Sequence, residues 1–145
     1  MSAGAPIPRR WTVELDGIRW LPRLIDKARM RERGQLGSYL LGHSPVDRAF
    51  LKRAGVSTEE FAAIVRASPD DAAVLAALRA HAGWNEPSLR RWSARFPATY
   101  RFMIPLWDMD EGYRPRNPLY EIGFAVFRPV EGAVMATFRL ISRAP

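Results

Sequence analysis

The chain has 145 residues, 48 % of them hydrophobic, and its 22 Lys and Arg residues exceed its 15 Asp and Glu residues to give a formal charge of +7. It contains no cysteine, which excludes disulfides, thiol nucleophiles and thiolate metal sites. No apolar run is long enough to span a bilayer, and the first ten residues lack the apolar stretch of a signal peptide. We therefore expect a soluble, cytoplasmic, globular protein.

The positive charge has two interpretations. An excess of cations favours an anionic partner, such as nucleic acid or a membrane surface. It is also typical of an arginine-rich composition with solvated basic faces, and Lys27 and Lys52 are the only lysines in the chain. Charge alone does not distinguish the two interpretations.

A first helix is predicted to begin at Pro22, because a proline suits the first turn, where its missing N–H has no partner. Gly34 stands where a left-handed residue commonly ends a helix. Asp26 lies three residues from both Arg23 and Arg29, so salt bridges within the helix are expected. The apolar face, with residues at i, i+3, i+4 and i+7, consists of Leu21, Leu24, Ile25 and Ala28.

Two further short helices are indicated by their capping residues. Ser44 and Pro45 match the N-cap and first position of a helix that Gly55 would close. Ser57 and Glu60 match the capping box of the next helix. The inward side chains of these two helices are expected to be Val46, Phe50, Leu51, Phe61, Ile64 and Val65.

A fourth helix is predicted to start at Ser68 and its neighbours by the same logic and to end at Gly83. A fifth is predicted from about Glu86 to Phe96, with Pro97 as its stop. Short helices with short connections are typical of a compact bundle. The inward side chains of these two helices are expected to be Val74, Leu75, Leu78, Leu89, Trp92 and Phe96.

The character of the chain changes after Phe96. Residues 97–118 form an apolar segment and a polar, proline-containing connector, and apolar residues then alternate along 120–126 and 134–140. Two such runs around a Pro/Gly turn predict a β-hairpin, and large apolar groups on both of its faces suggest a homodimer contact. The expected fold class is mostly α: a bundle of about five short helices with a C-terminal β-hairpin. It forms a single domain of residues 1–145, with a helical core at 6–96, a connector at 97–118 and a hairpin extension at 119–145.

A family resemblance rests on residues 20–29, Trp-Leu-Pro-Arg-Leu-Ile-Asp-Lys-Ala-Arg, followed by Leu36-Gly37-x-Tyr39 and Pro45-x-Asp47. Their order and spacing resemble the bacterial domain-of-unknown-function family numbered 5069, over roughly residues 6–96. The resemblance implies a small, mostly helical cytosolic protein. It implies no catalytic residue.

Residues of this motif form the first candidate site. Arginine forks suit carboxylates and phosphates, so Arg23, Asp26, Arg29 and Tyr39 are candidates for holding a small anionic ligand or the substrate of an enzyme. A cleft lined by these residues would favour a ligand site. Their burial within the packing would make the motif structural.

Arg90, Arg91 and Arg95 form a second candidate site, because they lie near Trp84 and Trp92 in the sequence. Cations among aromatic residues are typical of proteins that bind nucleic acids by phosphate contact and base stacking. The other interpretation is that the aromatic residues belong to the core and that the arginines are solvated.

Other chemistry is weakly supported. His43 and His81 are the only histidines, and a metal site needs three or four converging ligands. No glycine-rich phosphate loop or nucleophile elbow is present. We therefore predict no catalytic residue, metal or cofactor, and interpret the chain as a non-catalytic binding or adaptor domain. The alternatives are a protein that binds or transforms a small anion, and a weak electrostatic nucleic-acid binder.

Overall fold

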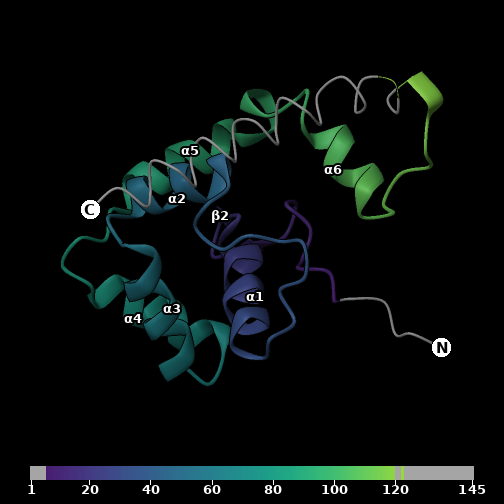
Figure 1. Cartoon of the computed structure of the whole chain (residues 1–145). Helices are drawn as coiled ribbons and strands as arrows, with labels where there is room; N and C mark the ends of the chain where they lie inside the picture. The colour runs from purple at the N-terminus through teal and green to yellow at the C-terminus, as the bar shows by residue number, and fades with distance from the viewer. Residues whose placement is uncertain (1–5, 120–121, 123–145) are drawn as a thin grey trace, which may run out of the picture. The chain divides into compact units, whose positions relative to one another are not determined.

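The structure is a computed structural model that describes residues 6–119 and residue 122. It is mostly helical, as the sequence predicted, and the chain divides into two compact units at Thr99 and Tyr100. The first unit holds a two-stranded antiparallel sheet and five helices, and the second contains the short helix α6 (Figure 1). This division lies close to the predicted limit of the helical core, and the single-domain organisation stays a prediction.

The small sheet opens the first unit and was not predicted. Strand β1 (Glu14–Leu15) pairs with β2 (Ile18–Arg19) through a tight turn at Asp16 and Gly17. Both turn residues have positive φ, 49° and 74°, which is the conformation that favours an Asp-Gly pair in two-residue hairpins. The Asp-Gly signal was therefore available in the sequence.

The helices of the first unit begin and end close to their predicted capping residues. The five are α1 (Leu21–Glu32), α2 (Pro45–Ala54), α3 (Thr58–Ala67), α4 (Asp71–Ala80) and α5 (Glu86–Thr99). The predicted N-cap Ser44, the left-handed C-cap Gly55 and both hydrogen bonds of the capping box between Ser57 and Glu60 are confirmed. Residues within one turn of each other make these caps, so the local sequence specifies them.

Three helix limits differ from the prediction, and one of them is the end of α4, which closes at His81 instead of the predicted Gly83. Asp70 caps α4 by accepting from Ala73 N, whereas Ser68 donates its hydroxyl to Ile64 O at the end of α3. Helix α5 continues to Thr99 with Pro97 inside its last turn. A proline so close to the C-terminus removes one hydrogen bond and leaves most of the helix intact, so it does not stop the helix at the preceding residue.

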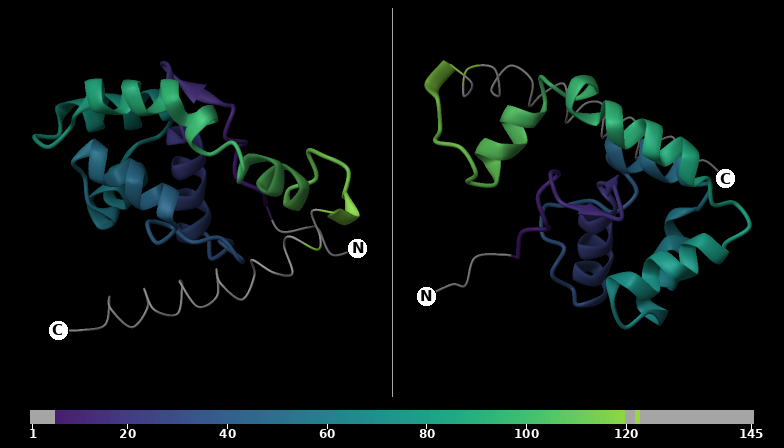
Figure 2. Two further views of the ribbon diagram at one scale, coloured as in Figure 1. Left: turned by 90° about the horizontal axis from the view of Figure 1, so that it is seen from above. Right: turned by 180° about the vertical axis from the view of Figure 1, so that it is seen from behind.

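The core of the first unit lies where the helices face each other. Helix α1 packs on α3 and on β1, α3 on α4, and α2 on α5, which also contacts β2 (Figures 1 and 2). The apolar faces predicted for all five helices are confirmed except for Ile64, which is half-buried. Fully buried members include Leu21, Leu24, Ile25, Phe50, Phe61, Val74, Leu78, Leu89 and Phe96.

A close approach of two glycines joins the end of α2 to the loop before α5. A Cβ added to Gly55 would lie 1.9 Å from the carbonyl oxygen of Gly83, and one added to Gly83 would lie 2.0 Å from that of Gly55. Asn85 N also donates to Ala54 O at 3.3 Å. These contacts place the C-terminus of α2 beside the N-terminus of α5, so the two helices run antiparallel.

The second unit departs from the sequence prediction. Residues 104–110, expected as part of an apolar segment and connector, form α6 (Ile104–Asp110), which makes a sixth helix. Pro105 occupies its first turn, a start signal that the prediction overlooked. Leu119 and Ile122 are helical, so the predicted extended conformation is wrong there. The rest of the predicted hairpin, and the dimer contact assigned to it, lie outside the described residues.

Candidate functional site

A buried ion pair joins the first two helices. Lys27 Nζ lies 3.0 Å from each carboxylate oxygen of Asp47, and the two side chains are 4 % and 0 % exposed. The indole Nε1 of Trp20 donates to Asp47 Oδ1 at 2.8 Å, and the backbone N of Gly42 donates to Oδ2 at 3.0 Å. Four hydrogen bonds from three segments therefore converge on one carboxylate, as a buried charge requires.

The surrounding backbone is shaped to make this convergence possible. Trp20 precedes α1 with φ of 69°, an uncommon left-handed conformation for a residue with a side chain. Gly42 has φ of 76°, and a Cβ added to it would lie 2.1 Å from the hydroxyl of Thr58. Asp47 lies in the first turn of α2, where Ser44 Oγ accepts from its backbone N. The family motif residues Trp20, Lys27 and Asp47 thus act together as one internal cluster.

Arg23 and Tyr39, two residues of the first candidate site, lie beside this cluster. The Arg23 guanidinium lies 5.1 Å from the Trp20 ring centroid and 5.6 Å from that of Tyr39. Its Nη1 donates to Arg9 O at 3.0 Å and to Pro8 O at 3.4 Å, and the residue is only 6 % exposed. Arg23 therefore joins the packing through cation–π and backbone contacts.

Asp26 and Arg29, the other two residues of that site, belong to a network around Arg9. Asp26 accepts from the backbone N, Nε and Nη2 of Arg9, at 2.7–2.9 Å. Asp71 at the start of α4 accepts from both Arg9 and Arg29. Salt bridges from Asp26 to Arg23 and Arg29 of its own helix were predicted. Asp26 pairs instead with Arg9, which lies 17 residues away along the chain.

These contacts change the acidity of the groups. Burial lowers the pKa of the Arg9 guanidinium, but hydrogen bonds to Asp26 and Asp71 outweigh it and raise the pKa above its usual value. Burial raises the pKa of Asp71, but hydrogen bonds and charges from Arg9 and Arg29 dominate and hold it below 3.8. The network is thus a set of charges that neutralise one another at neutral pH.

The lowered pKa of Asp71 predicts an acid-sensitive contribution to stability. Because the folded-state pKa lies below the unfolded one, the contribution is complete above about pH 4 and is lost as pH falls through the folded-state pKa. Denaturant unfolding of the wild type and of Asp71→Asn should therefore give free energies that differ at pH 7 and converge toward pH 3. A constant difference across that range would contradict the assignment.

The four residues of the first candidate site are therefore all engaged in contacts with other residues of the first unit. Arg23 and Tyr39 stack on one another, Asp26 and Arg29 are linked through Arg9 and Asp71, and Arg9 O joins the two groups. Arg9, Lys27 and Asp71 were not among the residues predicted for this site. A signal existed for Lys27, since it lies at i+7 from Trp20 and three residues after Leu24, on the edge of the apolar face.

A second cluster of side chains lies where α2 packs against α5. Phe50 and Trp92 meet at this contact with ring centroids 5.8 Å apart. Asp47, three residues before Phe50, turns to α1, and Ser93, one residue after Trp92, accepts from the backbone N of Arg19 in β2. These two residues mark the core side of the helix pair.

Arginines occupy the opposite side of the same contact. Arg53 lies three residues after Phe50, and Arg91 and Arg95 lie one before and three after Trp92, so helical spacing directs all three away from the core side. All three are exposed, as is the neighbouring Lys52. We call Lys52, Arg53, Arg91 and Arg95 the α2–α5 basic face.

The charges of this face are not neutralised within the described part of the chain. Lys52, Arg91 and Arg95 have no ion pair there, and Arg53 donates only to Ala49 O of its own helix, at 2.9 Å. The only acids of α2 and α5 are Asp47, which is buried, and Glu86. Several surface arginines elsewhere have acidic partners, in the pairs Arg19–Glu14, Arg31–Glu59, Arg66–Glu32 and Arg79–Glu86, whereas the exposed Arg33 and Arg101 have none among the described residues.

Arg90, predicted together with Arg91 and Arg95, does not share their face. Its guanidinium bonds Glu86 at 2.8 Å and lies 3.5 Å from Asp16 in the β-turn. Glu86 also accepts from Arg79 and from the indole of Trp84, and the hydrogen bond from Arg79 is the largest cause of its strongly lowered pKa. Arg90 therefore helps to hold the hairpin on α5.

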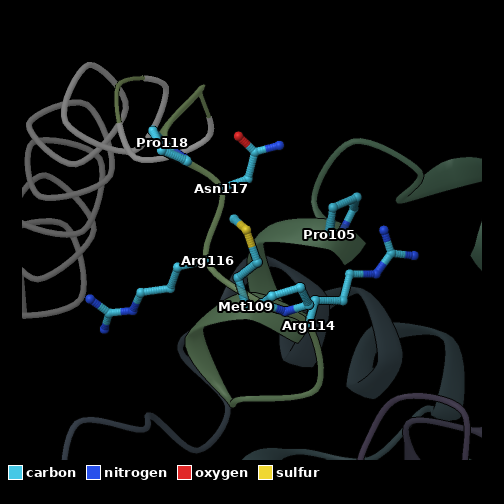
Figure 3. A pocket seen from close by; sticks show the side chains of 7 residues that line it. Pro105, Met109, Arg114, Arg116, Asn117 and Pro118 are labelled. Atoms are coloured by element: carbon cyan, nitrogen blue, oxygen red, sulfur yellow. The ribbon is translucent and has the colours of Figure 1, made fainter.

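In the second unit, a hollow of about 420 Å³ lies between α6 and the segment after it. Figure 3 shows Met109 at its centre, with the guanidinium groups of Arg114 and Arg116 pointing away from each other. Convergent polar groups are what fix a small ligand in a pocket. The two arginines do not provide them here.

Across residues 6–119 and 122, no three His, Asp or Glu side chains gather closely enough to hold a metal ion. Over the same residues, no helix combines the length and apolar character needed to cross a membrane.

Comparison with protein-family models identifies a family. A family model described as "Domain of unknown function (DUF5069)" matches residues 5–101, which cover the first unit and its junction with the second. None of the curated proteins compared with the chain matches it. The match includes every residue of the buried clusters and of the α2–α5 basic face.

Proposed function

Because the chain belongs to the DUF5069 family, whose description names no activity, we propose from the geometry of its first unit that it is a non-catalytic domain that binds an anionic polymer. The observation that carries this proposal is the α2–α5 basic face. Four exposed cations are carried by two packed helices whose only acids are the buried Asp47 and Glu86, and Glu86 is already paired with Arg79 and Arg90. A face of one charge sign raises the local concentration of the opposite charge and accelerates association.

The family motif supports the proposal in another way. Lys27, Asp47 and Arg23, the motif residues best suited to chemistry, are 4 %, 0 % and 6 % exposed and are held by internal contacts. A catalytic group must reach a substrate. We therefore assign the motif to the fold and assign recognition to the exposed helices.

A small anionic ligand held by Arg23, Arg29 and Tyr39 has less support. Arg23 bonds the carbonyls of Pro8 and Arg9, and Arg29 bonds Asp71, so an entering anion would compete with contacts that already exist. Arg29 Nη2 is buried without an acceptor among the described residues. The Nε of Arg23 is likewise buried without an acceptor among the described residues, but two single donors on side chains that are already bonded elsewhere are too little to define a ligand.

The proposal predicts that the full-length protein binds fluorescein-labelled heparin, a polyanion without bases, at low salt. In anisotropy titrations, binding should weaken steeply as salt is raised, because each cation–anion contact releases a counterion. The triple variant Arg53→Gln/Arg91→Gln/Arg95→Gln should lose most of the affinity. No binding by the wild type at low salt would refute the proposal.

A matched control separates the face from net charge. The triple variant Arg19→Gln/Arg31→Gln/Arg66→Gln removes the same number of charges from arginines paired with Glu14, Glu59 and Glu32. Both side chains of each pair are at least 25 % exposed, and such pairs contribute little to stability, so the control should fold. It should keep most of its heparin affinity, and an equal loss in both variants would mean that only total charge matters.

A further inference from the structure

We infer that the anionic polymer is a double-stranded nucleic acid, bound through its phosphates and without base recognition. This inference rests on the proposed function, because it names the ligand of the same α2–α5 basic face. It follows from which side chains the face presents and from how they are arranged on two helices.

The aromatic residues near the face are not available to stack on bases. Trp92 is 6 % exposed and Phe96 is fully buried, and each packs its ring against core aromatics. Trp84 is half-buried and donates its indole N–H to Glu86. Proteins that bind single strands without sequence preference combine cations with exposed aromatic platforms. The described surface of α2 and α5 offers only the cations.

The cations are divided between two packed helices. Arg91 and Arg95 are one helical turn apart on α5, a rise of roughly 6 Å, and the consecutive residues Lys52 and Arg53 lie on α2. The axes of packed helices lie about 8–10 Å apart. A duplex presents phosphates along two strands, with about one charge per 1.7 Å of its axis and half that density on one strand. Cations carried by two helices therefore gain more contacts from a duplex than from one strand.

An anionic membrane fits the face less well. Peripheral membrane helices usually insert apolar side chains beside their cations. None of the large exposed apolar residues of the described chain belongs to α2 or α5: they are Ile7, Val13, Phe102, Met103, Tyr113, Leu119 and Ile122. Without such an anchor, α2 and α5 would have only charge with which to hold a lipid surface.

The test measures the binding of the full-length protein to three probes. These are a fluorescein-labelled DNA duplex of about 20 base pairs, one strand of that duplex alone, whose bases are free to stack on aromatic side chains, and phosphatidylserine vesicles, with binding to the vesicles measured by sedimentation. We expect the duplex to bind several-fold more tightly than the single strand, and A·T-rich and G·C-rich duplexes to bind within about twofold of each other. Vesicles should bind more weakly than the duplex.

The variant Arg91→Gln/Arg95→Gln should reduce duplex affinity and flatten the slope of log affinity against log salt by about 2, since each lost phosphate contact removes about 0.9. The control Arg31→Gln/Arg66→Gln should leave the slope within about half a unit of the wild type. Single strands or vesicles bound as tightly as the duplex would overturn the inference but leave the proposed function standing if heparin still binds. A strong preference for one duplex sequence would also overturn it. If neither heparin nor the duplex binds, both proposals fail.

Discussion

Replacing Asp47 with asparagine is expected to lower the free energy of unfolding by about 3–5 kcal/mol, the usual cost of breaking a buried ion pair on one side. The carboxylate is fully buried and accepts from Lys27, Trp20 and Gly42. An amide cannot neutralise Lys27 and offers one acceptor oxygen in place of two. Urea unfolding followed by circular dichroism would measure the change.

A double-mutant cycle sharpens this prediction. Lys27→Met removes the stranded cation, so the double variant Lys27→Met/Asp47→Asn should be more stable than the sum of the two single changes implies. Glu59→Gln is the matched control, because Glu59 is 79 % exposed and pairs with Arg31 at the surface, where a change should stay within about half a kcal/mol. A loss below about 1 kcal/mol for Asp47→Asn would show that the cluster does not stabilise the fold.

Replacing Leu24 with alanine is expected to cost about 2–5 kcal/mol, because the lost methyl groups leave a cavity that packed neighbours fill only in part. Leu24 is fully buried in α1, which packs on α3 and β1. Leu119→Ala makes the same chemical change at a residue that is 77 % exposed. That control should alter the unfolding free energy by less than about half a kcal/mol, and equal effects of the two changes would contradict the burial of Leu24.

Both predictions concern the family motif, and they test whether its residues stabilise the fold or bind a ligand. If Asp47→Asn unfolds part of the protein while heparin binding by the remaining folded fraction is unchanged, the motif serves the fold. The binding face can then be tested by itself, because its four cations are exposed and, within the described residues, contribute no ion pair to the core.

The features that the sequence by itself determined about this protein depend on interactions between residues close together in the chain. The caps at Ser44, Gly55 and Ser57 depend on hydrogen bonds and backbone conformations within one helical turn. The buried faces of the helices depend on a period of 3.6 residues. For the same reason the mostly helical fold class could be predicted in advance. The family was recognised separately, from the resemblance of residues 20–29, 36–39 and 45–47 to its members. The missed signals, Asp16-Gly17 and Pro105, were also local.

Only the tertiary structure decided which charges are internal and which are presented to solvent. Lys27 meets Asp47 across 20 residues, and Arg9 meets Asp71 across 62, distances over which no helical or strand period carries information. The contact of Phe50 with Trp92 packs α2, which carries Arg53, against α5, which carries Arg91 and Arg95, while Arg90 pairs with Glu86 and Asp16. A formal charge of +7 could therefore be counted in the sequence, but packing decided which of the described cations are neutralised and which, on α2 and α5, are not.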